Sequence, residues 1–384
     1  MGILSQILFC FDEKLFSVVP GNIGHFRQQF AQQFIKPENG TTVMLVVWDD
    51  PIDHLHIFCR CRDFLQGIYP LFDIGKIMEA IGRELDCWIT IPVGLNPNVS
   101  PTKVECKAVF PRRSGYSTSG TVLSVGEGVT AVVPGDRVAM LHTTHSEFLE
   151  VEEKNLCKLD DNIAFKEAAI WHIATFPLAA IRKCRLEIGE SAIVMGMGIL
   201  GMMAVKLLRA AGATPIIAAD PVAEKREEAL LLGADYALDP FALDFAQKVK
   251  TLTAGGCNIA IEVTGHGKAL DTVLDCMALF GRVALLGCTR NSDFTIDYYR
   301  KVHAPGITMV GAHTNARPQT ESYPGMWTTM DDMKALQKLV LSGRLDFSSM
   351  VAEVHSPYDA FEIYRRLAAE KTFPLVQFDW SMMK

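Results

Sequence analysis

Residues 191–220 read SAIVMGMGILGMMAVKLLRAAGATPIIAAD, and this stretch decides the fold class. An apolar run, a glycine turn, a long amphipathic run and a second apolar run follow one another, which is the order strand, turn, helix, strand. Gly196, Gly198 and Gly201 form the pattern GxGxxG at the junction of strand and helix. In such a turn the first glycine permits the tight bend, the second lets the backbone approach a pyrophosphate, and the third lets helix and strand pack closely. The stretch predicts a dinucleotide site, with Ile199 and Leu200 in the first helical turn, where free amides favour an anion.

The same alternation continues downstream and predicts a complete doubly wound parallel sheet. Further strands are expected at residues 236–239, 258–265, 281–287 and 306–313, with helices at residues 221–234, 241–254 and 266–280 between them. Six strands in an alternating βα pattern are typical of an α/β Rossmann-type fold.

Asp220 follows Gly201 by nineteen residues and ends the second strand. A carboxylate at this point accepts hydrogen bonds from ribose hydroxyls and repels a 2′-phosphate, which favours NAD(H) over NADP(H). Arg226, on the next helix, could soften this preference. The alternative is a glycine-rich turn with an incidental acid.

Composition bounds the class of protein. The chain has 384 residues, 49% of them apolar, and a formal net charge of −7, without a basic cluster that would suit nucleic acid or an anionic membrane. The apolar run at residues 192–205 ends at Lys206, too short to span a bilayer, and the N-terminus lacks the basic and small-residue features of a signal peptide. Ten cysteines without a CxxC pair indicate reduced core residues of a cytoplasmic protein. The expected partner is a small-molecule substrate.

The flanks of the alternating region differ in texture. Short β-like runs broken by glycine and proline, such as residues 120–126 and 136–141, predict a mainly β domain upstream. Downstream, helices are expected around residues 331–342 and 358–370, with a terminal strand at residues 373–380.

Several stretches together resemble the medium-chain dehydrogenase/reductase superfamily, the zinc alcohol and polyol dehydrogenase relatives. They are GYSTSGTVLSVGEGVTAVVPGDRVA (115–139), GESAIVMGMGILGMMAVKLLRAAGA (189–213), AIEVTG (260–265), GRVALLG (281–287) and FPLVQFDW (373–380). The resemblance implies a mainly β GroES-like catalytic domain at residues 1–165, a Rossmann domain at 166–311, and a return to the catalytic domain at 312–384. It also implies a homodimer or homotetramer, and cofactor contacts at Thr264, Gly265, Gly287, Ala312 and His313.

The departures from the family concern zinc. Zinc-dependent members have GHE where this chain has Gly115, Tyr116 and Ser117, so the resemblance implies that one ligand is lost. The region of the first ligand, residues 91–100, offers only Asn96 or Asn98, and the region of the third offers His172 and Thr175. Zinc prefers cysteine, histidine and carboxylate ligands, and the four-cysteine structural lobe is also missing, so no zinc is expected. The first ninety residues fit the family least and receive no function.

Without zinc, oxidation of an alcohol needs a base that takes the hydroxyl proton. By resemblance, His172 lies beside the nicotinamide and is the first candidate; a packed histidine is the alternative. The hydroxyls of Tyr116 and Ser117 could orient a substrate, although both could be plain turn residues. His142 and His145 could hold a metal or reach the substrate, whereas His54 and His56 alone do not make a metal site.

The sequence therefore predicts a cytoplasmic NAD(H)-dependent oxidoreductase for a secondary alcohol (a sugar, polyol or cyclitol) or its ketone. Two alternatives remain, a zinc-independent quinone or enone reductase and a catalytically silent NAD-binding protein. A hydrolase is disfavoured because GYSTSG has Ser119 where the nucleophile motif GxSxG has its second glycine.

Overall fold

The structure is a computed structural model that describes residues 114–288, 294–370 and 372–383, together with three short strands near the N-terminus. These strands are β1 (Leu8–Phe11), β2 (Lys14–Ser17) and β3 (Met44–Val47). The expectations for Asn96, Asn98, His54 and His56, and for most of the first ninety residues, lie outside the described residues.

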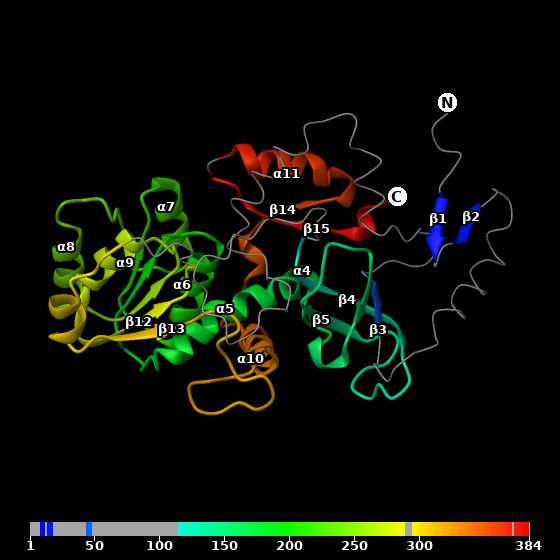
Figure 1. The fold of residues 1–384 in the computed structure, drawn as a ribbon, viewed down its shortest axis with the longest axis horizontal. Coiled ribbons are helices and arrows are strands. Elements are labelled where there is room, and N and C mark those ends of the chain that lie inside the picture. Colours follow the sequence, from blue (N-terminus) through cyan, green and yellow to red (C-terminus); the bar gives the residue numbers. More distant parts are fainter. Residues whose placement is uncertain are drawn as a thin grey trace.

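A six-stranded parallel sheet forms the part of the molecule that contains the glycine turn (Figure 1). Its order is β10-β9-β8-β11-β12-β13, so the chain starts in the middle, builds outward to one edge and then crosses over to build the other. This confirms the α/β Rossmann-type fold class, whose ligands bind where the strand order reverses. The strands are β8 (Ala192–Met195), β9 (Ile216–Ala219), β10 (Tyr236–Leu238), β11 (Cys257–Glu262), β12 (Met277–Leu285) and β13 (Thr308–Gly311).

Helices cover both faces of this sheet, and each face has its own buried apolar cluster. One expected boundary is wrong. The helix expected at residues 266–280 ends at Leu274, and residues 277–280 open strand β12, because Met277 pairs with Cys257 of β11. The helices of this region are α6 (Ile199–Ala211), α7 (Ala223–Leu231), α8 (Phe245–Leu252), α9 (Gly267–Leu274) and the π-helical turn η2 (Tyr299–His303).

A second, antiparallel sheet has the strand order β6-β3-β4-β5-β7. Its long strand β4 pairs with β5 on one side and β3 on the other, and buried apolar side chains of β4 and β5 fill a small core. The strands are β4 (Ser117–Val125), β5 (Arg137–Leu141), β6 (Phe148–Val151) and β7 (Leu156–Lys158), with the short helix η1 (Glu153–Asn155) before β7.

Helix α5 (Trp171–Lys183) runs between the two sheets (Figure 1). It packs against α6 and β12 on one side and against β4 and β5 on the other. This helix, which contains Pro177, was not predicted from the sequence pattern. The short helix α4 (Phe165–Ala168) precedes it, and the buried carboxylate of Glu167 accepts hydrogen bonds from the backbone of Phe347 and Ser348, so the C-terminal part is fastened to α4.

The C-terminal part adds two helices and a parallel strand pair. Helix α10 packs against α5, and α11 lies above the pair β14 and β15 (Figure 1). The elements are α10 (Thr329–Leu341), η3 (Ser348–Met350), β14 (Val351–His355), η4 (Pro357–Asp359), α11 (Ala360–Ala369), β15 (Leu375–Phe378) and η5 (Trp380–Met382). Within the described ranges, every helix is too short or too polar to cross a bilayer.

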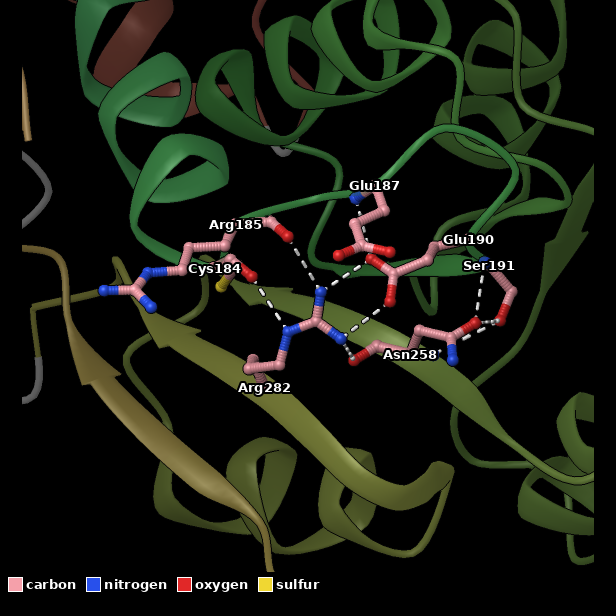
Figure 2. Close-up of polar contacts among 7 residues, drawn as sticks. All are labelled: Cys184, Arg185, Glu187, Glu190, Ser191, Asn258 and Arg282. Carbon is pink, nitrogen blue, oxygen red and sulfur yellow. Dashed lines mark hydrogen bonds and ion pairs between the residues drawn. The ribbon is translucent and has the colours of Figure 1, made fainter. Parts of the chain in front are cut away.

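A half-buried ion pair holds the amino end of the parallel sheet to α5 (Figure 2). The guanidinium of Arg282, on β12, binds both carboxylate oxygens of Glu190, at 2.8 and 2.6 Å. The same group donates to the carbonyls of Cys184, Arg185 and Asn258, at 2.8, 3.1 and 3.4 Å. Two of these carbonyls belong to the chain that leaves α5, where helix carbonyls lack intrahelical donors. Arg282 therefore satisfies carbonyls at the C-terminal end of α5 and attaches that end to the sheet.

Candidate active site

The predicted cofactor residues converge at one edge of the parallel sheet, although they come from separate parts of the chain. Because all six strands are parallel, residues that follow them lie at the same, carboxyl edge. A Cβ added to Gly196, after β8, would lie 2.8 Å from the side chain of Thr264, after β11. One added to Gly287, after β12, would lie 2.2 Å from the amide nitrogen of Gly265. The structure thus brings these four residues together.

The three glycines of the turn have different surroundings. Gly196 has φ = 102°, a left-handed conformation that favours glycine. Gly201 lies in α6 directly against the turn, and a Cβ there would meet the carbonyl oxygen of Gly196 at 1.9 Å. Gly198, the N-cap of α6, has open space where its Cβ would be. The chain therefore fills the space behind the turn and leaves the outer side clear, which is the arrangement that a dinucleotide pyrophosphate needs.

Ile199 and Leu200, in the first turn of α6, both direct their side chains toward the core. The side chain of Leu200 is buried in the core, and that of Ile199 packs partly against it. Any contact with an anion would therefore come from their backbone amides at the helix start. His313, after β13, is exposed, and its Nδ1 accepts a hydrogen bond from the amide of Asn315 at 3.1 Å.

Asp220 is buried at the end of β9 and touches the glycine turn. Its Oδ2 accepts a hydrogen bond from the amide of Met197 at 2.8 Å, and its Oδ1 accepts one from the amide of Val222 at 2.9 Å. The guanidinium of Arg226 donates to the backbone carbonyls of Asp220 and Pro221, at 2.8 and 2.9 Å. The acid thus ties the second strand to the turn and carries negative charge beside it.

Sequence reasoning missed Glu262, the last residue of β11. Its side chain is 2% exposed, and its Oε1 accepts hydrogen bonds from the amide and the hydroxyl of Thr264 and from the amide of Gly265. Burial raises the pKa of this carboxyl. Glu262 shapes the turn that presents Thr264 and Gly265, and the only indication in the sequence is an acid inside the apolar run NIAIEV.

The predicted catalytic residues meet at the junction of α5 and the antiparallel sheet. The Nδ1 of His172 lies 2.8 Å from the carbonyl oxygen of Tyr116. The rings of Tyr116 and His142 both meet the His172 ring edge-on, with centroids at 5.7 and 4.8 Å, and Phe176 completes the surroundings. The hydroxyl of Ser117 donates to the carbonyl of Ala169 at 2.6 Å, so its proton is used within the fold.

The contact with Tyr116 assigns the protonation of His172. A carbonyl oxygen can only accept, so Nδ1 carries the proton and Nε2 keeps its lone pair. Burial, more than any other cause, lowers the pKa of His172 to about 3, which keeps the ring neutral at physiological pH. His172 is thus a neutral hydrogen-bond acceptor in a fixed orientation.

The two histidines of HTTH separate in the structure. The ring of His142 contacts His172, whereas the ring of His145 contacts Phe378 and Tyr364, with centroids at 5.2 and 6.5 Å. Over residues 114–288, 294–370 and 372–383, no three histidine, cysteine or acidic side chains gather in a way that could hold a metal ion. Cys157, Cys184, Cys257 and Cys276 are buried free thiols.

Two surface hollows of about 220 and 240 Å³ lie elsewhere. One is lined by residues of α8, α9 and the turn before β13, such as Lys250 and Lys301. The other lies between α6 and the end of α10, beside Arg209 and Arg344. Neither includes the glycine turn or His172, so the candidate site is defined by the strand ends and the α5 junction.

Comparisons with known proteins agree with this architecture. Residues 200–332 match the family described as zinc-binding dehydrogenase. The chain is 25% identical to D-guloside 3-dehydrogenase of Shigella flexneri over 243 residues, which cover 62% of this chain and 69% of that protein. The crystal structure of 2R,3R-butanediol dehydrogenase from Bacillus subtilis superimposes with a TM-score of 0.57 at 25% identity, covering 66% of this chain and 76% of that one.

Two more distant structures share the fold and hold nicotinamide dinucleotides. A short chain alcohol dehydrogenase from E. coli CFT073 was solved with NADH; it has a TM-score of 0.62 at 15% identity and covers 71% of this chain and 85% of its own. A protein from Sinorhizobium meliloti 1021 was solved with NADP; it has a TM-score of 0.57 at 19% identity and covers 67% and 81% of the two chains.

Proposed function

We propose that this chain, whose fold and relatives are those of the medium-chain dehydrogenase superfamily, is an NAD(H)-dependent oxidoreductase that interconverts a secondary alcohol and its ketone. The substrate class we propose is a sugar, polyol or cyclitol. The names of two relatives, D-guloside 3-dehydrogenase and 2R,3R-butanediol dehydrogenase, support a secondary hydroxyl as the reacting group.

One observation carries the proposal for NAD(H): the Asp220 carboxylate, held against the glycine turn by the Met197 amide at 2.8 Å. Its negative charge next to the ribose position favours hydroxyls and disfavours a 2′-phosphate. The open space at Gly198 and the packed contact at Gly201 support binding of the pyrophosphate at the start of α6. When bound, NAD⁺ supplies the hydride acceptor. Thr264, Gly265, Gly287 and His313 complete the proposed contacts at the carboxyl edge.

We assign the proton transfer to His172. Its Nε2 lone pair faces away from the Nδ1 bond to Tyr116, so it can accept a hydroxyl proton. A pKa of about 3 makes protonation at pH 7 cost roughly 5 kcal/mol for an isolated ring. The alkoxide that forms when the proton leaves is negative and offsets part of this cost. Burial raises the pKa of Tyr116, so its phenol stays neutral beside the His172 ring.

Catalysis without zinc is part of the proposal. It rests on Tyr116, which stands where zinc-dependent relatives have a ligand, and on the separation of His142 from His145. Among the described residues, His172 and His142 alone do not provide the three or four ligands that a zinc site needs. Near-stoichiometric zinc in the purified, untagged protein would overturn this part of the proposal.

We also propose the division into residues 1–165, 166–311 and 312–384, and a homodimer or homotetramer. Strand β13 supports the oligomer, because it lies at the edge of the parallel sheet and, among the described strands, pairs with β12 alone. The neighbouring Tyr298 and Tyr299 are about two-thirds exposed, at 64% and 68%, as expected for residues that a partner covers. Sedimentation of the purified chain tests this directly, since a monomer at micromolar concentration contradicts it.

The experiment for the function is a turnover screen. NAD⁺ or NADP⁺ reduction is followed at 340 nm with sugars, polyols and cyclitols, and NADH or NADPH oxidation is followed with ketones, quinones and enones. We expect turnover of a secondary alcohol with NAD⁺. Turnover of quinones or enones with NADPH alone would support a zinc-independent reductase instead, and binding of NADH without any turnover would support a silent NAD-binding protein.

A further inference from the structure

Helix α5 has a weak point one turn after His172. Pro177 lies inside the helix and has no backbone N–H, so the hydrogen bond to the carbonyl of residue 173 is missing. The turn between His172 and Pro177 is therefore held less firmly by the helix itself. Contacts from outside the helix must fix the position of the imidazole.

Arg317 provides such a contact from the loop after β13. Its side chain is only 3% exposed, and its Nη2 donates to the carbonyl oxygen of Thr175 at 2.8 Å. The hydroxyl of Thr175 in turn donates to the carbonyl of His172 at 2.7 Å. On the other side, Nη1 donates to the hydroxyl of Thr329, the first residue of α10, at 3.0 Å. Arg317 thus connects the weak turn of α5 to the start of α10.

Arg317 is one of two arginines that pair with the same buried acid, Asp332. The fully buried carboxylate of Asp332 accepts a 2.7 Å hydrogen bond from Arg182 on Oδ1, while Arg317 Nη1 lies 3.5 Å from Oδ2. That Oδ2 accepts no hydrogen bond from the residues that the structure describes. Two guanidinium groups therefore share one acid, and the tighter pair is the one with Arg182, which also stacks on Trp327 at 3.6 Å. Neutralising Asp332 does not require Arg317.

We propose that Arg317 is a positioning residue for His172, acting through Thr175. This inference rests on the proposed role of His172 as the base. The charge-assisted hydrogen bond from Arg317 to the Thr175 carbonyl fixes the position of this turn of α5. In that position Nδ1 of His172 reaches the Tyr116 carbonyl, which sets the direction in which Nε2 points. A displacement of the reacting group by about 1 Å can cost about 10²-fold in rate.

The test compares Arg317→Met with Arg182→Met. Each variant removes one of the two cations and leaves Asp332 paired with the other, so both should fold, but only Arg317→Met frees the Thr175 carbonyl. We expect kcat to fall about 10- to 100-fold in Arg317→Met, less in Arg317→Lys, and less than about 3-fold in Arg182→Met. The dissociation constant for NADH should stay within about 2-fold, because Arg317 does not contact the glycine turn.

A second readout does not depend on turnover. In protein with ¹⁵N-labelled histidine, the Nδ1–H of His172 should give a slowly exchanging imidazole proton resonance, assigned by its loss in His172→Ala. We expect it to broaden or vanish in Arg317→Met and to persist in Arg182→Met. An unchanged resonance in Arg317→Met, or equal losses of kcat in the two methionine variants, would overturn the positioning role.

His172→Ala distinguishes a failure of the base assignment for His172 from a failure of the positioning role of Arg317. If His172→Ala keeps kcat within a few-fold of wild type, the base assignment fails, whatever the resonance shows. If His172→Ala loses at least about 10²-fold and Arg317→Met loses nothing, the base assignment stands and the positioning role fails.

Discussion

The glycine turn offers the sharpest prediction, because two of its glycines differ in what a single methyl group would meet. In Gly201→Ala the new Cβ would lie 1.9 Å from the carbonyl oxygen of Gly196, and a Cβ–oxygen contact needs at least 3.0 Å, so α6 and the turn must separate by about 1.1 Å. Overpacking of this kind costs about 1–3 kcal/mol. For Gly201→Ala we expect the melting temperature to fall by roughly 2–10 °C.

Gly198→Ala should behave in the opposite way. Nothing lies within 4 Å of the new Cβ, and the backbone at φ = −76° and ψ = −173° suits alanine. Alanine is a poorer N-cap than glycine, so stability should fall by less than about 1 kcal/mol. The methyl group would occupy the side from which a pyrophosphate approaches, and losing one charge-assisted hydrogen bond there weakens NADH binding about 10-fold or more.

The assay pairs differential scanning calorimetry of the two variants with NADH titrations of each. We expect Gly198→Ala to melt close to the wild-type temperature and to bind NADH weakly, and Gly201→Ala to melt at a lower temperature. Wild-type NADH affinity in Gly198→Ala would refute the assignment of the pyrophosphate to this turn. A wild-type melting temperature in Gly201→Ala would refute the packing on which the turn depends.

Three further predictions address charge. Burial lowers the pKa of His172 from 6.5 to about 3, so between these pH values the unfolded chain binds a proton at this residue and the folded chain does not. The free energy of unfolding should therefore fall as the pH drops below 6.5. His172→Phe should remove about 2 kcal/mol of the loss between pH 6.5 and 5, measured by urea unfolding. Asp220→Asn should weaken NADH and strengthen NADPH binding, with an unchanged ratio of the two affinities counting against a role in selectivity. Arg282→Gln removes the guanidinium that binds Glu190 and three backbone carbonyls and should cost about 2–3 kcal/mol in thermal unfolding. NADH affinity, which depends on the other end of the sheet, should not change.

Local pattern was enough to predict the parallel sheet and the residues at its carboxyl edge. Apart from the boundary between α9 and β12, the strands and helices there follow from hydrophobic periodicity, and parallel pairing then brings Gly196 to Thr264 and Gly265 to Gly287. Asp220 could be placed because its spacing from Gly201 belongs to the same motif. The end of α9 could not, since residues 276–280 are apolar in either conformation, and only the pairing of Met277 with Cys257 makes them a strand.

The α5 junction depends on contacts that a linear reading does not contain. His172 meets the Tyr116 carbonyl across 56 positions of sequence, and Arg317 meets Thr175 across 142. Nothing near Arg317 in the sequence indicates that its guanidinium is buried. Glu262 was missed for a related reason, because an acid in an apolar run is interpretable only when its backbone donors are known.

We propose above all that the glycine turn and Asp220 form an NAD(H) site. The most direct measurement is a calorimetric titration of the purified chain with NADH and, separately, with NADPH at the same ionic strength. We expect saturable NADH binding at one site per chain, at least about 10-fold tighter than NADPH binding, a factor that corresponds to about 1.4 kcal/mol. Tighter binding of NADPH, or no binding of either dinucleotide, would contradict it.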